Sequence, residues 1–189
     1  PEDWWFASTS PNRDLNDEME VHRSHKSNNY YIEKARNAAC HALDYNRFSY
    51  SFFRTTNDHH TACACRYCEV ANFIKSKPFI DFLNQVTGLE LTVVNECFAN
   101  RYSGGSWLAT HSDDVNGRLA FVCHLTKNWN ISWGGLYVAH NPDGTLSAMP
   151  PSFNRLAIFT VGSNQTPHCV TPILPGISHS RYSITGWAQ

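Results

Sequence analysis

The sequence lacks any run of about 18 consecutive apolar residues, the length that a membrane-spanning helix needs, and it lacks the N-terminal pattern of a secretory signal peptide. It also lacks a dominant charge, because 15 lysines and arginines oppose 16 aspartates and glutamates. No basic surface of the kind that binds nucleic acid is therefore indicated. We expect a cytoplasmic protein without a membrane partner, and no nucleic-acid partner is indicated.

The sequence also lacks an even number of cysteines. The chain has seven cysteines in 189 residues, and a chain of this length buries enough surface to fold without disulfides. An odd number of cysteines at this size favours reduced thiols in a cytosol over a disulfide framework. The length corresponds to about one domain, 1–189, which we expect to act as a monomer or a homodimer.

The first half of the chain has a mixed pattern that predicts helices and one strand. Apolar residues recur at helical spacing over 29–43, and aromatic residues alternate as in a strand over 48–53. A second helix is predicted over 78–88, with Pro78 in its first turn and Gly88 just past its end. These elements would support the rest of the chain.

The second half of the chain predicts short β-strands, rich in Val, Ile, Phe, Tyr and Thr and separated by Gly, Asn and Pro. The predicted strands cover 91–102, 119–126, 135–139, 155–161, 168–173 and 182–187. Such a series indicates a mainly β fold with flanking helices, as a sandwich or jelly-roll barrel. Residues 91–189 would form its core and 1–90 its helical and strand support, with the aromatic run 4–6 as a wedge against it.

The stretch WLATHSDDVNG ends a predicted strand and places His111 and Asp113 two positions apart. In an extended segment, positions i and i+2 project from the same face. An imidazole and a carboxylate on one face provide two ligands for a divalent metal, and two histidines with one carboxylate form the ligand set of non-haem Fe(II) oxygenases. The short H-x-D pattern also occurs by chance in hydrogen-bonded turns, so its meaning depends on a third ligand.

His168 is the best candidate for that third ligand, because it begins a late strand of the predicted barrel. His179 is a weaker candidate, since it would project from the same strand face as Arg181. Asp114 is the alternative carboxylate, but its side chain should point away from the face of His111.

The stretch SRYSITGW would aim Arg181, Ser183 and Thr185 together into a barrel through strand alternation. An arginine buried in a barrel requires an anion, and its forked guanidinium suits a carboxylate. A ferrous site next to a carboxylate-binding arginine indicates a keto-acid cosubstrate.

An ordered series of motifs extends this interpretation: RYSGGSWLATHSDD, HLTKNW, WGGLYV, PPSFNRLAIF, PHCV and RYSITGW. Through them the sequence resembles the Fe(II)- and 2-oxoglutarate-dependent dioxygenases, and among them the prolyl-hydroxylase group that includes the hypoxia-inducible-factor prolyl hydroxylases and their bacterial relatives. The resemblance implies a double-stranded β-helix, the jelly-roll fold of cupin-like proteins. It also implies Fe(II), 2-oxoglutarate and O2, with ascorbate as a candidate accessory reductant.

The resemblance implies roles for individual residues. His111, Asp113 and His168 match the iron-ligand motif of the family. Arg181 matches the basic residue that pairs with the far carboxylate of 2-oxoglutarate, although the interval from His168 to Arg181 is a few residues longer than usual.

Further positions match the family's cosubstrate pocket. Tyr102 matches a tyrosine that lines this pocket, although an aromatic residue at this place is also compatible with simple core packing. Thr185 and Trp187 match positions close to the pocket, and Ser183 shares their strand face. Where the hypoxia-type hydroxylases place a second tyrosine hydroxyl on the cosubstrate carboxylate, this sequence has His124, so the grip on the carboxylate would differ.

The implied function is hydroxylation of an unactivated C–H bond, foremost in a prolyl residue of a protein or peptide, with decarboxylation of 2-oxoglutarate to succinate. The same chemistry on a free amino acid or another small molecule, including desaturation or ring closure, stays open. Halogenation is disfavoured because Asp113 is present. The alternative from another class is a catalytically inactive, cupin-like sensor that binds a metal or ligand.

A second cluster lies in HHTACACRYC, which contains His59, His60, Cys63, Cys65 and Cys68. Three thiols and an imidazole could bind zinc tetrahedrally. Structural zinc sites usually pair one C-x2-C with a distant second half, however, so a loop with reduced cysteines is the favoured interpretation.

Overall fold

Strands dominate the part of the chain that the structure, a computed structural model, describes: residues 4–9, 20–22, 29–45, 47–55, 65–113, 117–161 and 166–189. The strands are β1 (Trp5–Ser8), β2 (Glu20–His22), β3 (Tyr50–Arg54), β4 (Val94–Tyr102), β5 (Trp107–His111), β6 (Leu119–His124), β7 (Tyr137–His140), β8 (Leu146–Met149), β9 (Arg155–Thr160), β10 (His168–Val170) and β11 (Arg181–Ala188). The helices are α1 (Asn29–Asp44), α2 (Arg66–Ile74), α3 (Lys77–Thr87) and a short 3-10 helix (Ile131–Trp133).

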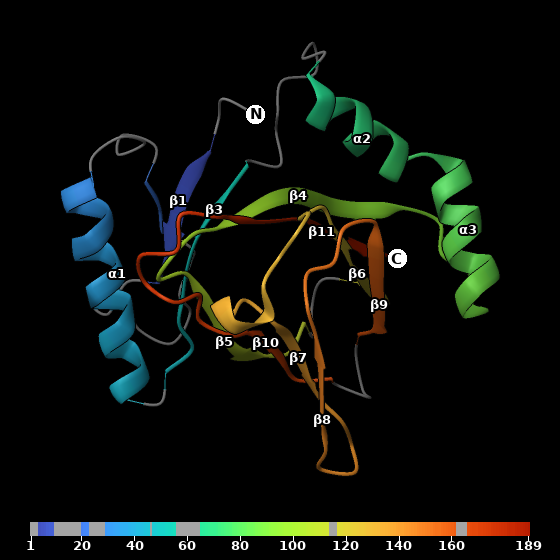
Figure 1. Ribbon diagram of the computed structural model, residues 1–189. Helices are drawn as coiled ribbons and strands as arrows, with labels where there is room; N and C mark the ends of the chain where they lie inside the picture. The colour runs from blue at the N-terminus through green and yellow to red at the C-terminus, as the bar shows by residue number, and fades with distance from the viewer. Residues whose placement is uncertain are drawn as a thin grey trace.

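The strands form one antiparallel sheet that curls on itself (Figure 1). Its order is β8-β7-β10-β5-β3-β4-β11-β6-β9, and β1 pairs with both β2 and β3. The two ends of this path face each other, because the rings of Tyr137 in β7 and Phe159 in β9 have centroids 5.7 Å apart. The predicted mainly β jelly-roll with flanking helices is therefore confirmed.

The predicted helices are present and lie at opposite sides of the sheet (Figure 1). α1 contacts β1 and β3, whereas α2 contacts β4 and packs on α3. Gly88 ends α3 in the left-handed region, at φ 71°, where its N–H donates to the carbonyl of Asn84. Glycine adopts this conformation without steric cost, which is why it ends helices so often.

Three features of the first half of the chain differ from the prediction. β3 is a full member of the sheet between β5 and β4, so this half contributes to the barrel wall as well as supporting it. Residues 5–8 form β1, in which Phe6 pairs with Phe53 of β3, so the aromatic run continues the sheet and is not a separate wedge. α2 was not predicted, because its apolar residues follow directly on a cysteine-rich stretch without a helix-start signal.

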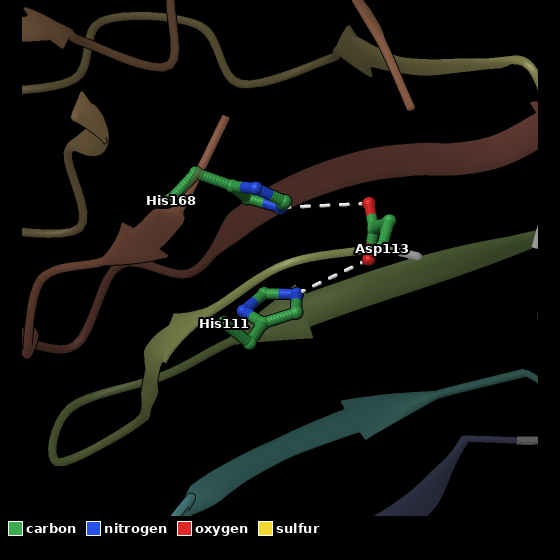
Figure 2. A group of neighbouring side chains, drawn as sticks. All are labelled: His111, Asp113 and His168. Atoms are coloured by element: carbon green, nitrogen blue, oxygen red, sulfur yellow. Dashed lines mark ion pairs between the residues drawn. The ribbon is translucent and has the colours of Figure 1, made fainter. Parts of the chain in front are cut away.

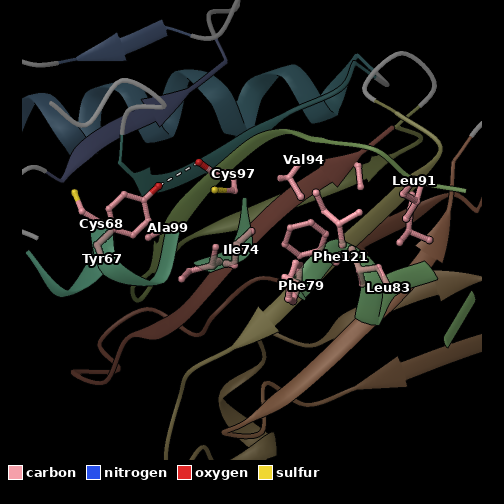
Figure 3. Close-up of a cluster of buried hydrophobic side chains, with 14 residues drawn as sticks. Tyr67, Cys68, Ile74, Phe79, Leu83, Leu91, Val94, Cys97, Ala99 and Phe121 are labelled. Carbon is pink, nitrogen blue, oxygen red and sulfur yellow. Dashed lines mark hydrogen bonds between the residues drawn. The ribbon is translucent and has the colours of Figure 1, made fainter. Parts of the chain in front are cut away.

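The main hydrophobic core lies between the sheet and the helices α2 and α3 (Figure 3). In α3, Phe79, Ile80 and Leu83 are buried against it, as the helical spacing of these residues requires. Phe121 of β6 and Ile184 of β11 belong to the same core. Because side chains alternate along a strand, the residues next to Phe121 in β6 and next to Ile184 in β11 face the inside of the curled sheet.

Within the described residues, every helix is too short or too polar to span a bilayer.

Candidate metal centre and cavity

Three side chains that can ligate a metal ion converge inside the curled sheet: His111, Asp113 and His168 (Figure 2). Their ligand atoms all lie within 4.8 Å of one another. Oδ1 of Asp113 is 3.4 Å from Nε2 of His111, and Oδ2 is 3.6 Å from Nε2 of His168. Two imidazole nitrogens and a carboxylate oxygen at this spacing fit one divalent ion.

The sheet itself brings the three residues together. His111 ends β5 and pairs in register with His168, the first residue of the antiparallel strand β10. The two imidazole rings have centroids 4.3 Å apart. Asp113 follows β5 by two residues, so the expected common face of His111 and Asp113 is found.

Backbone carbonyls orient both imidazole rings. Nδ1 of His111 lies 3.0 Å from the carbonyl oxygen of Ala109, and Nδ1 of His168 lies 3.0 Å from that of Thr166. When each Nδ1–H donates to its carbonyl, the lone pair of each Nε2 points toward Asp113 and is available to a metal.

The electrostatics of the three groups also suit a metal. Burial alone would raise the pKa of Asp113, but the adjacent imidazoles of His111 and His168 outweigh it and hold this pKa below the usual range. Burial, followed by repulsion from His111, lowers the pKa of His168. An ionised carboxylate and a neutral imidazole are the protonation states that ligate metals.

These side chains line a cavity of about 290 Å³ whose wall is rich in aromatic side chains. Arg181 lies in the same cavity and is 1% exposed. Its Cζ lies 4.9 Å from the ring centroid of Tyr102, which stacks in turn on Phe52 at 4.8 Å. Nη1 of Arg181 is 3.4 Å from the hydroxyl of Ser183, whereas its Nε has no hydrogen-bond partner among the described residues.

Arg181 is therefore a buried cation for which the described part of the chain provides no carboxylate. Burial lowers its pKa, and the nearest compensating group is the phenol of Tyr102. Burial also raises the pKa of Tyr102, so this phenol stays neutral. A buried guanidinium without a counter-ion fits a cavity that receives an anionic ligand.

The other predicted pocket residues on β11 behave as strand alternation requires. Ser183, Thr185 and Trp187 line the cavity together with Arg181. The hydroxyl of Thr185 accepts a hydrogen bond from Nδ2 of Asn100 at 2.8 Å. Trp187 lies at the metal-ligand end, where its indole helps to lower the pKa of Asp113.

His124 has a less direct position than the predicted pocket residues on β11. It pairs in register with Ser183, so both side chains project from the same face of the sheet. Its side chain is buried, and both ring nitrogens have no partner among the described residues. It is not, however, among the side chains that line the cavity. Burial and the nearby charge of Arg181 lower the pKa of His124 to about 3.

The alternative histidine ligand is not brought to this site. His179 stacks on the ring of Trp133, with centroids 4.7 Å apart, and does not line the cavity. Asp114 lies outside the described residues.

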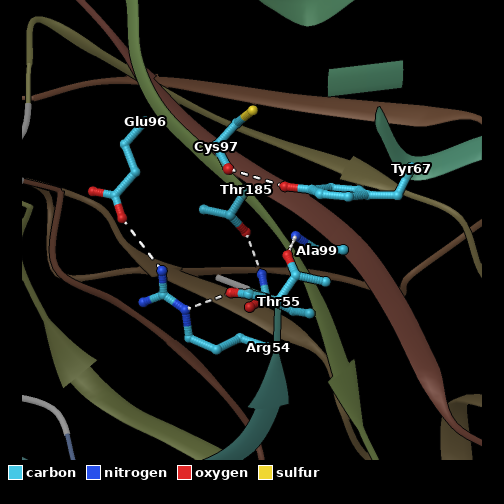
Figure 4. A network of polar contacts seen from close by, with 8 residues as sticks. Arg54, Thr55, Tyr67, Glu96, Cys97, Ala99 and Thr185 are labelled. Carbon is cyan, nitrogen blue, oxygen red and sulfur yellow. Dashed lines mark hydrogen bonds and ion pairs between the residues drawn. The ribbon is translucent and has the colours of Figure 1, made fainter. Parts of the chain in front are cut away.

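Sequence analysis missed several polar side chains that line the cavity, among them Arg54, Asn100 and Tyr137. Arg54 ends β3, donates from Nε to the carbonyl of Thr55 at 3.1 Å and pairs through Nη2 with Glu96 at 3.3 Å (Figure 4). Asn100 and Tyr137 occupy inward positions of their strands, which alternation could have indicated. Arg54 could not be found this way, because no sequence pattern placed β3 inside the sheet.

The second cluster of cysteines and histidines is only partly described. Sγ of Cys65 lies 3.6 Å from Sγ of Cys68 at the start of α2. Cys63, His59 and His60 lie outside the described residues, so a loop with reduced cysteines stays the favoured interpretation and zinc binding the alternative.

Comparison with known proteins adds family relationships. Residues 97–189 match the family model of the 2OG-Fe(II) oxygenase superfamily. Prolyl 3-hydroxylase OGFOD1 of Mus musculus is 30% identical over 116 residues, which cover 58% of this chain and 21% of the relative. The Xenopus laevis protein of the same name is 29% identical over 116 residues, or 58% of this chain and 22% of the relative. The chain thus spans about a fifth of the length of these relatives.

Solved structures share the fold. A prolyl-4-hydroxylase of Pseudomonas putida has a TM-score of 0.53 at 19% identity and covers 85% of this chain and 87% of its own. A prolyl hydroxylase of Trichoplax adhaerens, solved in complex with a hypoxia-inducible-factor oxygen degradation domain peptide fragment, has a TM-score of 0.54 at 20% identity, covering 84% and 90%. The family match, the OGFOD1 relatives and the shared jelly-roll agree, and through residues 97–189 the chain belongs to the 2OG-Fe(II) oxygenase superfamily.

Proposed function

We propose that the protein is a non-haem Fe(II)- and 2-oxoglutarate-dependent dioxygenase that hydroxylates a prolyl residue of a protein or peptide. One observation carries this proposal: a single cavity contains a His-Asp-His group and a buried arginine to which the described residues offer no counter-ion. The first fits a ferrous ion and the second fits the far carboxylate of 2-oxoglutarate.

In this proposal His111, Asp113 and His168 hold Fe(II), and Arg181 binds 2-oxoglutarate. Bound iron would supply the coupling of O2 reduction and 2-oxoglutarate decarboxylation to oxidation of a C–H bond, which yields succinate, CO2 and the hydroxylated product. The chain's own residues position the reactants: carbonyls fix both imidazole rings, and the aromatic wall excludes water from the cavity. Tyr102, Ser183, Thr185 and Trp187 would complete the cosubstrate pocket, and ascorbate would keep the iron reduced.

The prolyl substrate is proposed on the similarity to proteins named as prolyl hydroxylases. An aromatic cavity suits a pyrrolidine ring, since such a ring presents mainly apolar surface. At the opening, Phe48 is 42% exposed and its ring lies 5.3 Å from that of His111, so a peptide could reach the metal ligands along this side.

The deciding experiment measures succinate formed by the Fe(II)-loaded protein with 2-oxoglutarate and oxygen, beside His111→Ala. Succinate that disappears in the variant supports the oxygenase, and mass spectrometry of prolyl peptides and free amino acids then tests for the gain of one oxygen atom. If no succinate forms, 2-oxoglutarate is titrated into the Mn(II)-loaded protein. Absence of binding there would favour a cupin-like sensor instead.

We further propose a cytoplasmic protein, on the ground that Cys40, Cys97, Cys123 and Cys169 form no disulfide among the described residues. A monomer or homodimer stays our expectation, which analytical ultracentrifugation would test.

A further inference from the structure

Tyr137 is the first residue of β7 and projects into the cavity beside the metal ligands. Its strand partner is Val170 of β10, two residues beyond His168. The ring centroid of Tyr137 lies 5.4 Å from that of His168 and 5.7 Å from that of Phe159. Packing against both rings therefore fixes the direction in which its hydroxyl points.

The hydroxyl of Tyr137 is buried and has no hydrogen-bond partner among the described residues. Tyr67 shows the ordinary arrangement, since its buried hydroxyl donates to the carbonyl oxygen of Cys97 at 3.1 Å. Leaving a buried hydroxyl without a partner is unfavourable, and most buried polar groups are paired. A phenol that lines a cavity in this state indicates a ligand atom as its acceptor.

The metal-ligand side chains differ in exposure between the two sides of the cavity. The side chain of His111 is 20% exposed, whereas that of His168 is only 7% exposed. A prime substrate would enter from the His111 side, and Tyr137 lies on the opposite side, against His168.

We propose that Tyr137 donates a hydrogen bond to 2-oxoglutarate and helps to hold it between the metal ligands and Arg181. This inference rests on the proposed function and adds a contact that the motifs of the sequence do not indicate. Tyr137 then acts as a binding residue for the cosubstrate and leaves the metal ligands unchanged.

The test is calorimetric titration of 2-oxoglutarate into the anaerobic, Mn(II)-loaded protein, which requires no turnover. Tyr137→Phe removes only the hydroxyl, and Tyr182→Phe, on the outward face of β11, is the matched control. We expect the Kd for 2-oxoglutarate to rise about tenfold in Tyr137→Phe, as for one hydrogen bond to a charged acceptor. The control and the Mn(II) affinity of both variants should equal those of the wild type.

A Kd for Tyr137→Phe within twofold of the wild type would overturn the proposal. An equal loss of Mn(II) affinity would overturn it too, because Tyr137 would then act by packing on His168. If the wild type itself binds no 2-oxoglutarate, the proposed function fails together with this inference. If the wild type binds it and Tyr137→Phe binds it equally well, only this inference fails.

Discussion

Replacing Gly186 by alanine should destabilise the fold, because β11 passes very close to its neighbours at this point. A Cβ at position 186 would lie 2.7 Å from the carbonyl oxygen of Glu96 and 3.0 Å from Cβ of Cys97, and it would overlap the ring end of Phe121. The Glu96 oxygen belongs to the backbone of β4, so it cannot move away without disturbing the pairing of β4 with β11. Overpacking of a core typically costs about 1–3 kcal/mol, and we expect the upper part of this range.

For a chain of this size, such a loss corresponds to a fall in Tm of roughly 6–12 °C, measured by far-UV circular dichroism of the metal-free protein. Phe121→Leu replaces the ring by a shorter side chain. In a double-mutant cycle with Gly186→Ala, it separates strain against the Phe121 ring from strain against the backbone of β4. The double variant should be at least about 1 kcal/mol more stable than the sum of the single effects. Additivity within about 0.5 kcal/mol would refute the clash with the ring, and an unchanged Tm of Gly186→Ala would refute the close approach altogether.

Three further predictions concern the metal, the core and pH. Mn(II) at 100 times its Kd should stabilise the protein by about 2.7 kcal/mol, seen as a Tm rise in scanning fluorimetry that Asp113→Ala abolishes; an equal rise in the variant would contradict the proposed site. Leu83→Ala, at a fully buried position of α3, should lower the free energy of unfolding in urea by about 2–5 kcal/mol, and a loss below 1 kcal/mol would contradict the observed packing. Burial lowers the folded pKa of His124 to about 3, so the contribution of His124 to stability is complete above its unfolded pKa of about 6.5. This contribution declines as the pH falls below about 6.5, by up to ~1.4 kcal/mol per pH unit. His124→Gln should therefore flatten the loss of stability of the metal-free protein between pH 6.5 and 5, as followed by urea denaturation.

The sequence allowed the second half of the fold to be predicted because its strands carry local signals. Alternation placed Arg181, Ser183 and Thr185 on one face, and the structure puts all three in the cavity. The same rule joined His111 to Asp113. Each of these inferences depends only on residues two positions apart, which a strand holds in a fixed relation.

The remaining features depend on pairings between distant segments. The register that sets His168 opposite His111 joins strands 57 positions apart, and here the family resemblance supplied what local pattern could not. The insertion of β3 between β5 and β4 has no local signal either, so the cavity position of Arg54 was not foreseen. Arg54 is thus a side chain whose place in the cavity only the structure provides.

His124 is the position at which the family resemblance and this chain differ, and it allows a sharp prediction. It faces the same side of the sheet as Ser183 and lies near Arg181, with both ring nitrogens unpartnered among the described residues. Its low pKa keeps the imidazole neutral at neutral pH, so it offers one N–H donor without repelling the guanidinium. If that donor reaches the 2-oxoglutarate carboxylate, His124→Phe should raise the Kd of the Mn(II)-loaded protein for 2-oxoglutarate about tenfold. His124→Tyr, which restores the hydroxyl of the hypoxia-type hydroxylases, should keep this Kd within about threefold of the wild type. Equal affinities of His124→Phe and the wild type would mean that Arg181 binds the carboxylate without help from β6.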